Sequence, residues 1–322
     1  MLQFPAGNQE QRQVPLTNNK KSKHIIMKII IIISTILFIT TSCSKQEGND
    51  NDNDRLIKLD AGVSTVITAP LSKAAITTES FEATVAGWET SSTPNYTQAA
   101  TWTSTPTRIT IGSTDALELK NNPEYNLETS IKTYVTGWYP AGIPSNDMVS
   151  ITSTSGDIDV MYAGAISGSL DNKIKQTLTF NHLLTQIKFV IIGKGWETTN
   201  KLQSITIDQA QLPISLNIGT GVVTYATIAP LVIPDLSGQT VTTTATPAGV
   251  PVMIAPINGN ALPLTIVSDS GTTKITATTT DTNYQAGKAY TVTLNFNSSG
   301  IGVTATVTPW LEGSASGTIV EN

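Results

Sequence analysis

Short, regularly spaced runs of alternating apolar and polar residues constrain the fold of this chain most. The clearest run covers residues 289–296, where Tyr290, Val292, Leu294 and Phe296 alternate with threonines and an asparagine. A period of two places alternate side chains on opposite faces of a β-strand. Because similar runs recur along the chain with turn residues between them, the sequence predicts an all-β protein.

The composition favours the same fold class. Threonine supplies 51 of the 322 residues, and this β-branched side chain suits a pleated, half-exposed surface. Charged residues make up 13% of the chain, well below the ~25% of an ordinary soluble domain. No amphipathic helix pattern and no long crossover pattern occurs, so we exclude a helical bundle or coiled coil and expect no parallel sheet.

Two sets of strands are expected, with a break near residues 168–173. The first set is 56–60, 81–88, 107–111, 116–120, 131–139, 148–152 and 160–166; the second is 175–192, 202–207, 214–225, 250–255, 262–267 with 274–279, 289–296 and 302–309. Each set holds about seven strands, the number found in one antiparallel β-sandwich. We therefore expect two tandem antiparallel β-sandwich domains, at 56–172 and 173–322.

The N-terminal region has the pattern of an export signal. Lys28 precedes an apolar run at 29–39, which is too short to span a bilayer comfortably, and small residues then lead to Cys43. This order is typical of a bacterial lipoprotein, in which signal peptidase II cleaves between Ser42 and Cys43 and the cysteine is lipidated. Three acyl chains exceed what stable anchoring needs. Thr40 stands where leucine is usual, and an ordinary secretory signal is the alternative.

Residues 1–42 are thus expected to be an upstream extension and a lipoprotein signal peptide. Met27 is the expected start, with Met1 as the alternative. Residues 43–55 follow as an acidic tether, because 44–54 contains no apolar residue that could fold on its own. An acidic stretch behind a lipidated cysteine resembles the export signal of surface lipoproteins in the Bacteroidetes.

The charge argues against nucleic acid as a partner. The chain has a net charge of −5, and residues 1–42 contain five Lys or Arg and one acid, or +4. The remainder therefore carries −5 − 4 = −9, and a surface of that sign repels phosphate backbones.

Catalytic and metal-binding groups are scarce. One cysteine and two histidines exclude disulfide scaffolds and Cys/His zinc sites, and only His182 would remain after processing. A core histidine is the favoured interpretation of His182. Asp157 and Asp159 would share one face of a strand, as a glycosidase pair does, but a solvated turn is the favoured interpretation. We expect no enzyme, cofactor or metal.

Four tryptophans offer a further alternative. They are able to form a sugar-binding platform, although aromatic side chains in β proteins more often belong to the core. The four are Trp88, Trp102, Trp138 and Trp196.

Three segments together resemble the fimbrillin (Mfa-like) family of Bacteroidetes, the subunits of type V pili. They are a basic-Ala segment before a Phe strand at 73–81, an F-x-H-x-L-T-Q-I-x-F strand at 180–189, and an A-G-K-x-Y strand with a T-P-W ending at 286–310. The resemblance covers roughly residues 56–322. It implies two transthyretin-like β-sandwich domains and a lipidated precursor that is carried to the outer membrane and the cell surface or fimbrium.

The resemblance also implies polymerisation by strand exchange with other pilus subunits. In the family, a protease cuts after a basic residue and releases the first strand, and a strand of another subunit fills the groove. The candidate cleavage residues here are Lys73, where the family usually has arginine, and Arg55. We expect 56–72 to be the replaceable strand and 311–322 to supply the incoming one.

Two functions therefore stay open. The first is a stalk, anchor or tip subunit of a pilus, anchored in the outer membrane by its lipid. The alternative is a non-polymerising outer-membrane surface lipoprotein that binds a glycan or host ligand.

Overall fold

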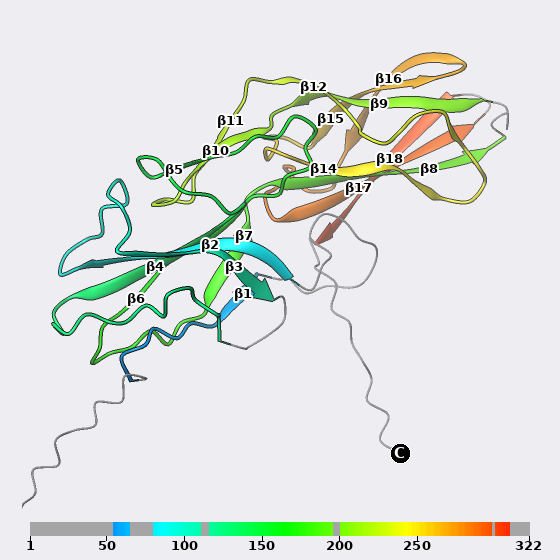
Figure 1. Ribbon diagram of the computed structural model, residues 1–322. Helices are drawn as coiled ribbons and strands as arrows, with labels where there is room; N and C mark the ends of the chain where they lie inside the picture. The colour runs from blue at the N-terminus through cyan, green and yellow to red at the C-terminus, as the bar shows by residue number, and fades with distance from the viewer. Residues whose placement is uncertain (1–53, 65–79, 111–115, 196–199, 298–299, 310–322) are drawn as a thin grey trace, which may run out of the picture. The chain divides into compact units, whose positions relative to one another are not determined.

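The computed structural model describes residues 54–64, 80–110, 116–195, 200–297 and 300–309 (Figure 1). This part of the chain contains eighteen strands in four sheets and no α-helix, which confirms the all-β fold. No helix long and apolar enough to cross a membrane therefore occurs among these residues. All the strands belong to one compact unit, Asp52–Asn322. The predicted signal peptide, Cys43 and most of the tether lie outside the described residues.

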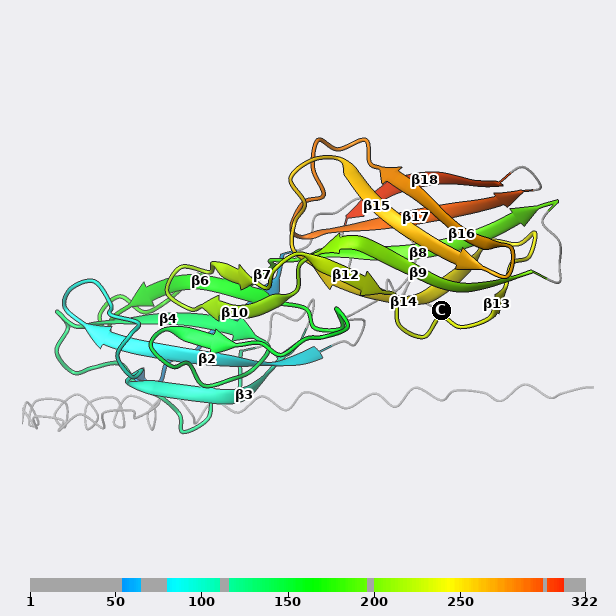
Figure 2. The same ribbon diagram turned by 90° about the horizontal axis from the view of Figure 1, so that it is seen from above.

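The largest sheet has six strands in the order β1-β7-β6-β4-β2-β3. Figure 2 shows β6, β4, β2 and β3 following one another in this order. Their bounds are Ala61–Val63 (β1), Ser80–Thr90 (β2), Trp102–Thr110 (β3), Lys132–Tyr139 (β4), Met161–Gly168 (β6) and Leu178–His182 (β7). Strand β1 is short and lies at the edge of the sheet.

Both faces of this sheet are covered. On one face Phe81, Ala83 and Val85 of β2 join a core cluster with the first described residues and the segment 116–125. On the other face Ala86 and Trp88 pack into a second cluster beneath a three-stranded sheet. That sheet has the order β11-β10-β5 and consists of Val223–Tyr225, Pro213–Asn217 and Met148–Ser150. A β2 buried on both faces does not alternate in polarity.

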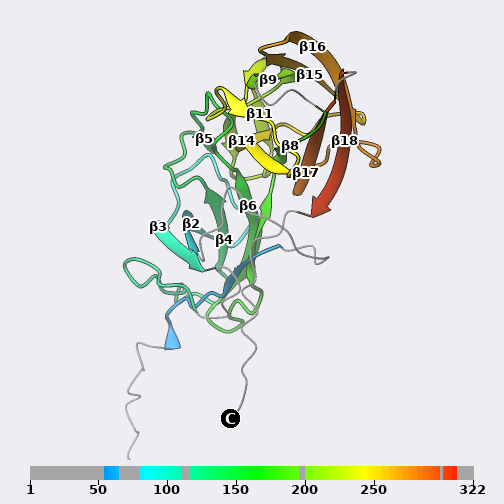
Figure 3. The ribbon, with the colours of Figure 1, turned by 90° about the vertical axis from the view of Figure 1, so that its right-hand side faces the viewer.

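Two further sheets enclose a separate core. One has the order β12-β9-β15-β16, with β13 also paired to β9, and the other β14-β8-β17-β18. Their bounds are Thr185–Lys194 (β8), Lys201–Ala210 (β9), Ala229–Val232 (β12), Gln239–Thr240 (β13), Thr246–Ile254 (β14), Ala261–Ser268 (β15), Gly271–Thr278 (β16), Lys288–Asn297 (β17) and Gly300–Pro309 (β18). Figure 3 shows β17 and β18 running alongside each other. The apolar face predicted for 289–296 is buried in this core, which confirms the alternation.

Two pairings differ from the prediction of purely antiparallel sheets. Strand β1 pairs with β7 in parallel, with Ala61 opposite Leu178, and β17 pairs with β8 in parallel, with Tyr290 opposite Ile187. Parallel neighbours need a long crossover connection, but here the connecting chain builds other strands instead of a helix. Alternation within a strand does not encode which way its neighbour runs, so these parallel pairs could not be predicted from the residue pattern.

Some strand limits also differ. The run 175–192 divides into β7 and β8 around a break at residues 183–184, and 116–120 forms only an isolated bridge from Ala116 to Asp60. Strands β12 and β13 were not expected. Strand β7 pairs with β6, and β10 pairs with β5, so sheet pairing crosses the position between 172 and 173. The division into two tandem domains there stays a prediction.

Candidate functional site

Residues 54–64, here called the first segment, lie along the edge of the six-stranded sheet. Ile57, Leu59 and Ala61 point into the core, and each is no more than 5% exposed, whereas Lys58 and Asp60 face solvent. The segment therefore has the alternation of a strand on a half-buried edge. It covers part of the core that otherwise belongs to the sheet.

Besides the parallel ladder between β1 and β7, five backbone hydrogen bonds hold the first segment. Three join it to the segment 116–125 and two join it to β7. They are Ile57 N to Pro123 O (2.8 Å), Tyr125 N to Arg55 O (2.9 Å), Leu117 N to Leu59 O (2.7 Å), Leu178 N to Asp60 O (2.8 Å) and Ser64 N to Phe180 O (2.8 Å). The segment is thus paired on both sides, but only along a short length.

Two cavities flank the first segment. One of about 150 Å³ lies against Tyr125 and Ile174, and one of about 480 Å³ lies against Ala116 to Leu119. Both are lined by Leu56 and Lys58. Open space therefore lies on both sides of the segment near Leu56 and Lys58.

Arg55, a candidate cleavage residue, is held in place by this packing. Its guanidinium forms an ion pair with Glu124 at 2.6 Å, and its carbonyl oxygen accepts the Tyr125 hydrogen bond. The neighbouring Asp54 pairs with Lys173, which lowers the pKa of the Asp54 carboxyl. Exposed ion pairs contribute little stability, so the backbone hydrogen bonds contribute more than these ion pairs to holding the first segment in place. The other predicted residues, Ser42, Cys43 and Lys73, lie outside the described residues, as do 65–72 and 311–322.

His182 and Asp159 form a buried pair. The Nδ1 atom of His182 lies 2.6 Å from Oδ2 of Asp159, and both side chains are 2% exposed. A second Asp159 oxygen accepts the backbone N–H of Val160 at 2.7 Å. His182 ends β7, the strand that pairs with β1 of the first segment. Asp159 lies two residues before β6, so the pair holds the end of β7 against the start of β6.

The solvated-turn interpretation of the two aspartates is therefore wrong for Asp159, and it describes Asp157. The Asp157 carboxylate is exposed and accepts a hydrogen bond from Ser153, and bonds led by one from Ser155 lower its pKa. One carboxylate is buried and the other is in solvent, so they do not face a common cleft. A sequence signal for the burial of Asp159 did exist, because the apolar residues 160–161 follow it directly.

The described tryptophans do not form an exposed platform. Trp138 is fully buried, Trp88 is 5% exposed, and Trp102 packs over Gly87. Trp196 lies outside the described residues. No group of three or more His, Cys, Asp or Glu side chains that might hold a metal ion occurs in the described part of the chain.

A small cavity that the sequence did not indicate lies over β2, β3 and β4. Its walls come from residues 95–100 and 143–147, which are far apart in the chain. Only the folded structure brings these two loops together, so no local sequence pattern could predict the cavity.

Comparison with known proteins gives a family and a fold. The sequence profile of a family described as fimbrillin-like matches residues 77–310. No curated relative matches the chain. Among solved structures, a candidate cell adhesion protein from Bacteroides uniformis is 15% identical, with a TM-score of 0.52 over 80% of this chain and 100% of that one. A candidate cell adhesion protein from Bacteroides ovatus is 14% identical, with a TM-score of 0.52 over 81% and 99%.

Proposed function

Because this chain belongs to the fimbrillin-like family, we propose that it is a structural subunit of a cell-surface type V pilus. In this proposal it is exported as a lipidated precursor and polymerises by strand exchange with other pilus subunits. The description of two structural neighbours as candidate adhesion proteins supports a role at the cell surface.

The observation that carries the proposal is the edge position of the first segment. Its removal would leave the Leu178 and Leu117 N–H groups and the Phe180 carbonyl without their partners. It would also uncover the apolar positions now filled by Ile57 and Leu59. An open edge of unpaired backbone groups beside an apolar groove strongly favours the addition of another strand.

The groove that the first segment occupies, between β7 and residues 116–125, sets requirements for the incoming strand. It must be extended, and its apolar side chains must recur every second residue to replace Ile57, Leu59 and Ala61. We propose that the C-terminal residues 311–322 of a neighbouring subunit supply this strand. Gly317-Thr318-Ile319-Val320 contains the β-branched residues that suit such a role.

Cleavage at Lys73 fits this exchange better than cleavage at Arg55. The Arg55 peptide is hydrogen-bonded and its side chain is ion-paired, and such a peptide must leave the structure before it enters a protease. A cut after Lys73 separates the whole first segment from β2. Replacing the family's usual arginine with lysine would select a protease that accepts lysine.

The membrane anchor is proposed at Cys43. Ten residues lie between Cys43 and Asp54, and the eleven steps of an extended chain span at most about 3.6 Å each, or roughly 40 Å in total. This length allows the folded body to stand clear of the outer membrane. In the alternative, a non-polymerising surface lipoprotein, the first segment never leaves its seat.

The test is the N-terminal sequence of the chain purified in pili from cell surfaces. We expect it to begin at Ala74, and we expect Lys73→Ala to abolish incorporation while Arg55→Ala does not. Polymerised subunits that all retain residues 54–64 would contradict strand exchange.

A further inference from the structure

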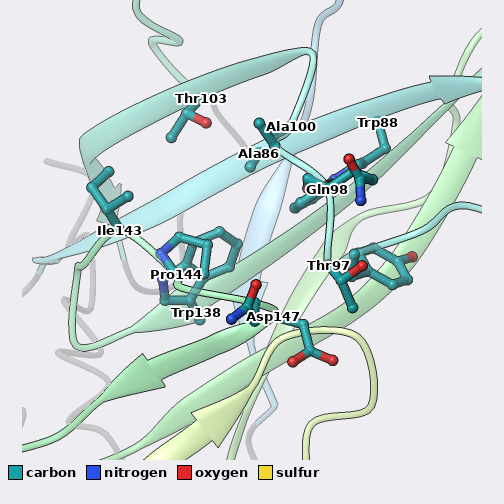
Figure 4. A pocket seen from close by; sticks show the side chains of 13 residues that line it. Ala86, Trp88, Thr97, Gln98, Ala100, Thr103, Trp138, Ile143, Pro144 and Asp147 are labelled. Atoms are coloured by element: carbon teal, nitrogen blue, oxygen red, sulfur yellow. Dashed lines mark hydrogen bonds between the residues drawn. The ribbon is translucent and has the colours of Figure 1, made fainter.

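The cavity over β2, β3 and β4 has a volume of about 250 Å³ (Figure 4). Its floor is formed by Ala86 and Trp138, and its two walls are the loops 95–100 and 143–147. The lining residues are Ala86, Trp88, Tyr96, Thr97, Gln98, Ala99, Ala100, Thr103, Trp138, Ile143, Pro144, Asn146 and Asp147. Small alanine side chains on the floor and one wall leave the space open.

The first wall is fixed by Trp88. The indole Nε1–H of Trp88 donates to the Gln98 carbonyl oxygen at 3.0 Å. The Tyr96 ring packs edge-on against Trp88, with ring centroids 4.9 Å apart, and burial raises the pKa of Tyr96 to about 12. This loop therefore has a set position before any ligand arrives.

The second wall is fixed in a similar way. The Trp138 indole Nε1–H donates to the Gly142 carbonyl oxygen at 3.0 Å. Ser145 and Met148 exchange two backbone hydrogen bonds around Asn146 and Asp147, whose φ angles are 48° and 64°. Positive φ at both central residues is the mark of a tight type I′ hairpin turn. A preformed pocket loses less entropy when it binds.

The lining combines an apolar surface with amide and hydroxyl groups and one carboxylate, that of Asp147. Ile143 is 71% exposed at the mouth. The side chains of Gln98, Thr103 and Asn146 make no hydrogen bond to another described residue, and Asp147 uses only its Oδ2, which accepts from Asn217 at 2.9 Å. Two amides, one hydroxyl and one carboxylate oxygen thus remain available, and the lining includes no Lys, Arg or His.

We propose that this pocket binds a single neutral monosaccharide unit, such as the terminal residue of a glycan. A sugar ring presents an apolar C–H face to apolar walls and hydroxyl groups to amides and carboxylates. The absence of a cation from the lining disfavours phosphorylated or acidic sugars. The volume lies just below the ~300–1,000 Å³ of pockets for larger ligands, which suits one ring. The subunit would then act as an adhesin as well as a structural element of the pilus.

The test uses the purified full chain in a detergent without a sugar headgroup. Saturation-transfer NMR would measure binding of the methyl glycosides of glucose, galactose, mannose and N-acetylglucosamine, with N-acetylneuraminic acid as an acidic probe. Asn146→Gly removes one side-chain amide, and glycine tolerates the positive φ of this position. Asn121→Gly is the matched control, because Asn121 is an exposed residue outside the pocket with a φ of 64°. Ala100→Leu fills the cavity.

We expect at least one neutral methyl glycoside to bind. Loss of one hydrogen bond predicts an affinity about two- to tenfold lower for Asn146→Gly, no change for Asn121→Gly, and no detectable binding for Ala100→Leu. The proposal would be overturned if no neutral glycoside binds, if Ala100→Leu or Asn146→Gly binds as the unaltered chain does, or if N-acetylneuraminic acid binds most tightly.

Discussion

Leu59→Ala should free the first segment without unfolding the sheet it covers. The Leu59 side chain is 1% exposed and packs among the residues that form the core beneath the six-stranded sheet. Truncating a buried leucine costs about 2–5 kcal/mol. If the first segment leaves the sheet without unfolding it, nearly all of this free energy shifts the equilibrium between the docked and the undocked segment. At 1.4 kcal/mol per factor of ten, the undocked fraction rises by about 30- to 4,000-fold.

Hydrogen exchange of individual backbone amides measures this opening. The N–H groups of Leu178 and Leu117 donate to Asp60 and Leu59, so their protection depends on the segment being seated. We expect their protection to fall by the factor above in Leu59→Ala. Amides of β4, in the middle of the same sheet, should keep theirs. Lys58→Ala is the matched control, because this side chain lies next to Leu59 and faces solvent.

Two results would refute this reasoning. If the amides of β4 lose protection together with those of Leu178 and Leu117, the first segment is an inseparable part of the sheet. If Leu59→Ala leaves the protection of both reporter amides unchanged, the seat does not depend on its apolar side chains.

Three further predictions concern the anchor, the buried pair and the dependence on pH. Cys43→Ala should abolish palmitate labelling and retention in the outer membrane, and equal labelling of both proteins would contradict the lipid anchor. Asp159→Ala should lower the free energy of unfolding in urea by about 3–5 kcal/mol and His182→Ala by about 1–3 kcal/mol, because each removes one partner of a buried pair; unchanged midpoints would contradict its burial. The hydrogen bond from Lys288 lowers the pKa of Asp281, so its stabilising contribution is present above the unfolded pKa of about 3.9 and is lost as pH falls through the lower folded pKa. Lys288→Met should therefore remove less than about 1 kcal/mol at pH 7 and make denaturation less sensitive to acid in that range, and an identical pH profile would contradict this.

The sequence predicted the strands that have one buried face or that pair with the next strand along the chain. The alternation at 289–296 identified β17 and its buried face, because a strand with one face in the core repeats every two residues. The same principle identified β15 and β16 as a pair of runs joined by a short turn. Where a strand is buried on both faces, as β2 is, the run stays detectable but its partner sheets do not.

Long-range partners were beyond the reach of the sequence pattern. Nothing local distinguishes a strand with a parallel neighbour, so the pairing of β1 with β7 was unexpected. The pairing of Asp159 with His182 spans 23 residues and depends on the turn between β6 and β7. The pocket walls depend on two indole N–H groups that each bind a loop carbonyl, which also requires the folded sheet.

The most direct test of strand exchange is the size of the purified chain after limited trypsin treatment. The account predicts oligomers, seen by sedimentation, whose chains begin at Ala74. The same treatment of a variant lacking residues 311–322 should yield folded, cleaved monomers. A cleaved chain that stays monomeric with its C-terminus intact would contradict strand exchange and favour the non-polymerising surface lipoprotein.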